Sequence, residues 1–240
     1  MADRRYLPLL LAPALFAQQE DPRGLLLRAR ALHLEGTSAS LAAALPLYRR
    51  VVALEPGSAE AHLRLSEALR DAGDPEAALA PAEKATALDP ASAEAAAHFA
   101  LLQYQRAKSG TLKPAEAIPA LRKAGERLPL DVEVWYRLAE LSEQEKDTTT
   151  ALRGWNRLAR LRPQALETWE RVAFHAKALG RYEARREATL TLGRRRLQGQ
   201  EAVRAVRLLE ELARDQVEAS YSAHAEESFL LLTRHLPEEA

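Results

Sequence analysis

The sequence contains no cysteine. Disulfide bridges, thiolate zinc sites and cysteine nucleophiles are therefore excluded. Aromatic residues are also scarce, at 5% of the 240 residues, and there are only 10 glycines. Alanine, leucine, arginine and glutamate are abundant instead. This composition indicates an all-helical protein.

The chain has no excess of charge of either sign. Lys and Arg together number 34, as do Asp and Glu, so the formal net charge is zero. A neutral chain has little bulk electrostatic attraction for nucleic acid or for an anionic membrane. We therefore expect no nucleic acid among the partners. The densest basic run, Arg194–Arg196, is interpreted as a helix C-terminus, where cations complement the helix dipole.

Long hydrophobic runs are missing as well. The apolar stretch Leu7–Ala17 contains two prolines and is shorter than the ~20 residues that a membrane-spanning helix needs. It follows Arg4 and Arg5, and this order of charged, apolar and small residues is typical of a secretory signal. We expect residues 1–17 to be a signal peptide cleaved after Ala17. The mature chain would then be exported, periplasmic or secreted, with no membrane-spanning segment.

Two other interpretations of this N-terminal stretch stay open. It could form a first capping helix of a repeat array, because such arrays need a terminal element with a polar outer face. It could also be an uncleaved anchor. A cytoplasmic location is the alternative to export.

Prolines recur at a regular spacing along the chain. The intervals between successive members are 34, 34, 39 and 34 residues, for Pro22, Pro56, Pro90, Pro129 and Pro163. A fixed period of this length is typical of a repeat architecture. Each repeat is one supersecondary unit that buries its apolar face only against its neighbours.

The clearest repeat covers Ala59–Ser92. Ser58 is a good helix N-cap, and apolar residues then recur at helical spacing until Gly73 ends the helix. Asp74 caps a second helix, which stops before Pro90 because the residue preceding a proline is disfavoured in helical conformation. The repeat therefore predicts two helices of similar length joined by a short turn.

The same pattern returns along the chain and resembles the tetratricopeptide repeat family. That family shows W-x2-L-G-x2-Y, then alanine, an aromatic residue and proline, over 34 residues. The opening matches at Trp135 and Trp169, the small position at Ala44, Ala78, Ala117 and Ala151, the large one at Tyr48 and Trp155, and the closing proline at Pro56, Pro90, Pro129 and Pro163. The resemblance covers about residues 22–196.

This resemblance implies an all-α fold, a right-handed α-solenoid of stacked antiparallel helix hairpins. We expect residues 18–196 to hold five such repeats and residues 197–240 to form a degenerate sixth repeat or a capping helix pair. The five repeats are about 22–55, 56–89, 90–128, 129–162 and 163–196.

Two departures from a regular repeat are visible. The third repeat is longer than the others, and we assign the excess to a loop around Lys108–Lys113. Pro46, Pro81 and Pro119 fall inside second helices. A proline there removes one backbone hydrogen bond, so we expect these helices to bend.

Residues suited to catalysis are not grouped in this sequence. The six histidines show no pair at the i, i+3 or i, i+4 spacing that places two metal ligands on one helix face. No glycine-rich phosphate loop and no nucleophile elbow is present. We therefore expect no enzyme activity, no cofactor and no metal site.

The resemblance also implies where a partner binds, since first helices line the concave groove in that family. The corresponding positions here are Glu60, Leu63, Glu67, Tyr104, Glu133, Tyr136, Glu140, Glu170 and Phe174. A groove rich in carboxylates with a few aromatic side chains favours a basic or amphipathic peptide. The alternative is that these residues form only a solvated helical face.

The function that we expect is a non-catalytic protein–protein interaction scaffold, which binds a peptide or protein segment in the concave groove. Two alternatives stay open. The chain could be a structural protein that self-associates through its solenoid ends, or an accessory subunit of a cell-envelope enzyme complex.

Overall fold

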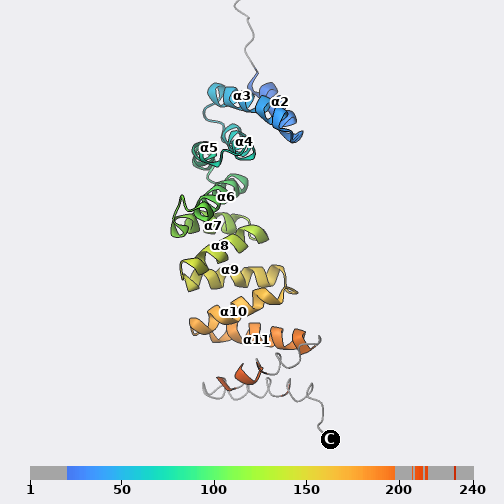
Figure 1. Cartoon of the computed structure of the whole chain (residues 1–240), viewed down its shortest axis with the longest axis vertical. Helices are drawn as coiled ribbons and strands as arrows, with labels where there is room; N and C mark the ends of the chain where they lie inside the picture. The colour runs from blue at the N-terminus through green and yellow to red at the C-terminus, as the bar shows by residue number, and fades with distance from the viewer. Residues whose placement is uncertain (1–20, 198–206, 208, 213, 216–229, 231–240) are drawn as a thin grey trace, which may run out of the picture. The chain divides into compact units, whose positions relative to one another are not determined.

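The computed structural model describes residues 21–197, 207, 209–212, 214, 215 and 230 (Figure 1). The signal peptide predicted at residues 1–17 and most of the predicted 197–240 pair lie outside these residues. Every regular element within them is an α-helix. The helices are α2 (Pro22–Leu34), α3 (Ser38–Leu54), α4 (Ala59–Asp71), α5 (Pro75–Leu88), α6 (Ala93–Ser109), α7 (Pro114–Arg127), α8 (Val132–Gln144), α9 (Thr148–Leu161), α10 (Leu166–Ala178) and α11 (Tyr182–Leu197).

The chain forms two compact units, an N-terminal unit up to Leu102 and a C-terminal unit from Gln103 onward. In the N-terminal unit α2 packs on α3, α3 on α4 and α4 on α5. In the C-terminal unit α7 packs on α8, α8 on α9, α9 on α10 and α10 on α11. This confirms the predicted all-α class, in which helix hairpins stack in succession. We call α2, α4, α6, α8 and α10 the first helices and α3, α5, α7, α9 and α11 the second helices.

Side-chain caps begin most helices, because the first backbone N–H groups of a helix have no partner within it. Ser58 Oγ accepts a hydrogen bond from Ala61 N at 3.2 Å, and Asp74 Oδ1 accepts one from Ala77 N at 2.9 Å. Asp131 and Asp147 cap α8 and α9 in the same way. The caps at Ser58 and Asp74 were predicted from the sequence. Ala165 begins α10 without a side-chain cap.

A residue with positive φ lies in the turn between the two helices of each hairpin. Glycine occupies this position at Gly36, Gly73, Gly110 and Gly180, with φ between 63° and 85°. Lys146 is the exception, with φ of 59° between α8 and α9. Glycine adopts this conformation without the steric penalty that a Cβ atom brings.

Small residues let the two helices of a hairpin approach closely. The alanines predicted at the small position of the second helices, Ala44, Ala78, Ala117 and Ala151, are fully buried. Gly154 on α9 lies so near α8 that an added Cβ would be 2.8 Å from Ala139 Cβ. The buried core therefore combines these small residues with large ones, among them Tyr48 and Trp155.

The longer third repeat differs from its predicted form. The helix α6 has 17 residues where α4 has 13, so most of the insertion extends the helix. Lys108 and Ser109 are helical, and the connection to α7 begins only at Gly110. An additional turn keeps its backbone hydrogen bonds paired, whereas a loop would leave them to water.

The helices α3, α5 and α7 continue through Pro46, Pro81 and Pro119 without interruption. The bends expected at these prolines stay a prediction. Among the helices that the structure describes, none combines the length and the apolar character needed to cross a membrane.

Candidate functional site

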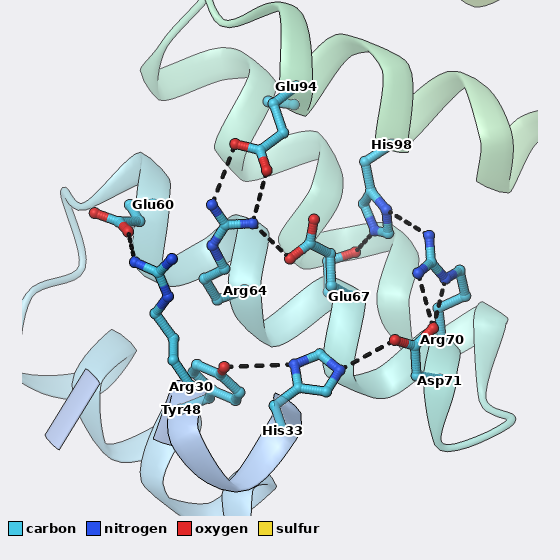
Figure 2. A network of polar contacts seen from close by, with 12 residues as sticks. Arg30, His33, Tyr48, Glu60, Arg64, Glu67, Arg70, Asp71, Glu94 and His98 are labelled. Carbon is cyan, nitrogen blue, oxygen red and sulfur yellow. Dashed lines mark hydrogen bonds and ion pairs between the residues drawn. The ribbon is translucent and has the colours of Figure 1, made fainter. Parts of the chain in front are cut away.

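Ion pairs connect consecutive first helices in the N-terminal unit (Figure 2). Arg30 on α2 binds Glu60 on α4, with 3.3 Å between Nη1 and Oε1. Arg64 on α4 binds Glu94 on α6 through two hydrogen bonds, of 2.8 and 3.2 Å. In both pairs the arginine precedes the glutamate by 30 residues, and the second pair follows the first by 34. The repeat period therefore reproduces the same contact.

Arg64 also binds a carboxylate on its own helix. Its Nη1 donates to Glu67 Oε2 at 2.8 Å, and both side chains are largely buried, with 18% and 19% exposed. A guanidinium held by two carboxylates is well oriented, because its planar donors match carboxylate geometry. The Glu67 carboxylate is therefore already paired with the Arg64 guanidinium.

His98 on α6 joins the same network through both of its ring nitrogens. Its Nδ1 accepts from Arg70 Nη1 at 3.2 Å, since an arginine can only donate. Nε2 must then carry the proton, and it donates to Ser66 Oγ at 2.7 Å. Ser66 in turn donates to the Ala78 carbonyl at 2.7 Å. Burial lowers the pKa of His98 to about 4, so the ring is neutral near pH 7.

His33 on α2 contacts α4 and α3 at the other end of the network. Its Nε2 lies 3.0 Å from Asp71 Oδ2, and its Nδ1 lies 3.4 Å from the Tyr48 hydroxyl (Figure 2). Burial works to raise the pKa of Asp71, but the hydrogen bonds from Arg70 and His33 outweigh it and lower that pKa. Burial also raises the pKa of Tyr48 to about 12, so its hydroxyl keeps its proton.

A pocket of about 530 Å³ lies over these side chains in the N-terminal unit. Arg30, Arg64 and Arg70 supply its cationic side, and Leu34 and Leu41 supply an apolar side. Because every arginine in it has a carboxylate or imidazole partner, the pocket is polar without a large net charge.

The first helices of the C-terminal unit carry a second network around Glu140. The Tyr104 hydroxyl donates to Glu140 Oε2 at 2.6 Å, and Lys108 Nζ lies 3.0 Å from Oε1. The Arg137 guanidinium stacks over the Tyr104 ring, 5.3 Å from its centroid. Burial, together with the hydrogen bond to Glu140, raises the pKa of Tyr104 to about 12.

Glu143, one turn further along α8, binds three side chains. Trp155 Nε1 donates to its Oε1 at 2.9 Å, and Arg171 Nη1 donates to its Oε2 at 3.2 Å. His175 Nε2 lies 2.6 Å from Oε1. Glu143 thereby ties α8 to both α9 and α10.

Two aromatic side chains stand out from this surface. Tyr136 on α8 is 42% exposed, and Phe174 on α10 is 68% exposed. The rings of Tyr136 and Trp155 pack against each other in a T-shaped arrangement, and so do the rings of Phe174 and His175. These contacts hold the aromatic rings in place while leaving apolar area in contact with solvent.

The predicted groove residues have several different environments. Leu63 is only 4% exposed and packs with Ala85 and Ala95, so its assignment to an exposed groove surface is wrong. The alanines of α5 and α6 leave room that this leucine fills. Four of the predicted glutamates form ion pairs with cations, namely Glu60, Glu67, Glu133 and Glu140. Glu170 is exposed on α10.

Sequence reasoning missed the cations that neutralise these carboxylates. Arg30, Arg64 and Arg171 all reach a glutamate on the neighbouring first helix. The 30-residue spacing of Arg30–Glu60 and Arg64–Glu94 is a pattern in the sequence that could have revealed two of them. Within the described part of the chain, no group of three or more His, Cys, Asp or Glu side chains is arranged to hold a metal ion.

Comparisons with known proteins agree with this geometry. The family model for the tetratricopeptide repeat matches residues 38–93 and 106–165. No curated protein matches the sequence. Among solved structures, the fold is similar to a crystal structure of MamA protein, with 17% identity and a TM-score of 0.56, covering 79% of this chain and 94% of that one.

Two further solved structures are similar at comparable levels. A second MamA structure, AMB-1, has 19% identity and a TM-score of 0.55, and the match covers 72% of this chain and 91% of that one. A chain from the structure of Naa15/Naa10 bound to HypK-THB has 16% identity and a TM-score of 0.53. This match covers 91% of the present chain and 37% of that one. At these identities the likeness concerns the fold. The family match and the stacked helix hairpins identify residues 38–93 and 106–165 of this chain as tetratricopeptide repeats.

Proposed function

We propose that the chain is a non-catalytic protein-interaction scaffold that binds a segment of another protein along its first helices. The observation that carries this proposal is the pair of exposed aromatic side chains, Tyr136 and Phe174, on the first helices α8 and α10. Exposed aromatic residues set among paired charges are typical of the centre of protein interfaces. The repeat fold supports the same conclusion, because such arrays present extended binding surfaces.

The charges around these rings bear on the chemistry of the partner. The sequence favoured a basic or amphipathic peptide because the first helices are rich in glutamate. A basic side chain would have to displace Arg137 from Glu133, or Lys108 from Glu140, and gain little by the exchange. An amphipathic segment that covers Tyr136 and Phe174 with apolar side chains is the better match.

A peptide library displayed on phage tests this proposal. Peptides selected on the wild-type chain should bind the double variant Tyr136→Ala/Phe174→Ala at least about tenfold more weakly, since interface aromatic residues commonly carry 2 kcal/mol or more. Leu130→Ala is the matched control, because Leu130 is an exposed apolar residue outside the helices, at 74%.

Thermal melting of the double variant by circular dichroism checks that it is folded. Selected peptides that bind wild type and the folded double variant equally would contradict the proposal. A library that yields no peptide for the first-helix surface would contradict it as well.

We also propose that the chain is exported. The support is the order of residues at the N-terminus, where two arginines precede a short apolar stretch and small residues. N-terminal sequencing of the protein from its native cells should begin at Gln18. A chain that still begins at Met1 in the cytoplasm would be evidence against export.

A further inference from the structure

The second helix α9 carries a row of arginines on one side. Arg153, Arg157 and Arg160 follow one another at spacings of four and three residues, which places them on the same helix face. Arg153 and Arg160 are exposed, and Arg157 is half-buried. These residues are separate from Tyr136 and Phe174, which lie on first helices.

A pocket of about 440 Å³ lies beside this row of arginines. Its wall includes the indole of Trp135 and the side chain of Asn156, the only asparagine of the sequence. Gly125 lets the indole lie directly against α7, because a Cβ atom at this position would be 3.1 Å from Trp135 Cζ2. The pocket is therefore a feature of how α7, α8 and α9 pack.

The arginines in this pocket are available to a ligand. Arg157 Nε donates to the Pro129 carbonyl at 2.7 Å, which fixes the guanidinium and leaves its Nη groups without a partner among the described residues. Arg160 forms no hydrogen bond or ion pair with any residue that the structure describes. Arg153 has only a loose pair with Glu126, at 3.7 Å, between two exposed side chains.

The charge balance of the pocket favours an anion, since three guanidinium groups face one carboxylate, Glu126. We propose that this pocket binds an acidic segment of a partner protein, with a partner carboxylate held by the Nη groups of Arg157 and by Arg160. Guanidinium groups bind carboxylates through two parallel hydrogen bonds, and a guanidinium that is already oriented loses less entropy on binding. Asn156 can both donate to and accept from a peptide backbone.

A peptide suits this site better than a polyanion. The chain has no net charge, so it offers no long-range attraction to nucleic acid or to an anionic membrane. Three cationic side chains beside a single pocket match a short acidic stretch rather than an extended phosphate backbone. The site extends the proposed function by a second binding surface with partner chemistry of its own.

A fluorescein-labelled oligoglutamate peptide is the probe for this site, with anisotropy as the readout. We expect the wild-type chain to bind it at low salt, and Arg157→Gln/Arg160→Gln to weaken binding at least about tenfold, because two charge-assisted hydrogen-bonding groups are lost. The matched control is Arg122→Gln/Lys123→Gln, which removes the same charge from exposed positions on α7. It should change the Kd by less than about twofold, because screened charges outside the site contribute little.

Several results would overturn this inference. Equal weakening by both double variants would mean that only net charge matters, and no binding by the wild type would mean that there is no site. Arg160→Gln alone keeps the test valid if the double variant fails to fold, because Arg160 has no described partner to lose.

Tighter binding of a single-stranded oligonucleotide or of phosphatidylserine vesicles, lost in the same variant, would replace the peptide as the occupant. Oligoglutamate binding should also survive in Tyr136→Ala/Phe174→Ala. The outcome for this pocket is therefore distinguishable from the outcome for the first-helix surface.

Discussion

At the scale of single residues, the partner of each histidine decides its behaviour. His33, His98 and His175 all bridge neighbouring first helices. His33 and His175 face carboxylates, Asp71 and Glu143, whereas His98 faces an arginine and a serine. The last environment stabilises the neutral ring, because burial and the neighbouring Arg70 cation both lower the pKa of His98.

His98 should make stability depend on pH. Its pKa is about 4 in the folded chain and 6.5 when unfolded, so between these values the unfolded state binds a proton that the folded state does not. Falling pH therefore favours unfolding. Urea titrations of wild type and His98→Gln should show that the wild-type advantage shrinks by about 2 kcal/mol between about pH 7.5 and about pH 5. An advantage that is constant or grows over this range would refute the assignment.

Lys146 is a second residue whose backbone conformation has a measurable consequence. It has a positive φ at the hairpin turn where the other repeats have glycine. Lys146→Gly should raise the free energy of unfolding by about 0.5–1 kcal/mol, because it relieves the steric cost of a Cβ atom in this conformation. Lys146→Ala is the control and should bring no gain. A urea midpoint that falls in the glycine variant would disprove the strain.

At the scale of helices, close contact between backbones matters more than helix propensity. Gly154 is in the interior of α9, where glycine is intrinsically unfavourable. Its position against Ala139 explains why glycine is nevertheless present, since an added Cβ would also lie 3.2 Å from the Ala139 Cα. The α8–α9 hairpin therefore depends on the absence of a side chain.

Gly154→Ala should lower the free energy of unfolding by about 1–3 kcal/mol, although alanine is the better helix former. The reason is that α8 and α9 must move apart to accommodate the methyl group. Gly57→Ala is the matched control, because nothing lies within 4 Å of an added Cβ there. It should change stability by less than about 0.5 kcal/mol. Equal effects of the two substitutions in urea denaturation would contradict this reading of the contact.

The sequence predicted the helix caps and turns, but it did not predict the burial of Leu63 or the length of α6. Caps such as Ser58 and Asp74 and turns such as Gly73 are local, so neighbouring residues suffice to predict them. The burial of Leu63 depends on the size of residues in two other helices, and the length of α6 depends on whether an insertion keeps helical hydrogen bonds. Neither can be deduced from a repeat position alone.

At the scale of the molecule, the repeat period determines which residues meet. The period of 34 residues predicted the succession of hairpins, because each hairpin must cover its neighbour. The ion pairs follow the same period, but at a spacing of 30 residues that belongs to the contact between first helices. In each unit, ion pairs bind glutamates of the first helices, among them Glu60 and Glu94 in the N-terminal unit and Glu133 and Glu140 in the C-terminal unit. The exposed aromatic side chains Tyr136 and Phe174 lie on first helices of the C-terminal unit, whereas the arginines of the proposed acidic-peptide pocket lie on α9.

The central claim is that partners bind along the first helices. Hydrogen exchange followed by mass spectrometry, with and without a library-selected peptide, tests it most directly. Amide protection on binding should rise in α8 and α10, around Tyr136 and Phe174, and should stay unchanged in α3 and α5. Protection confined to second helices, or the absence of any protection by a peptide that binds, would contradict the claim.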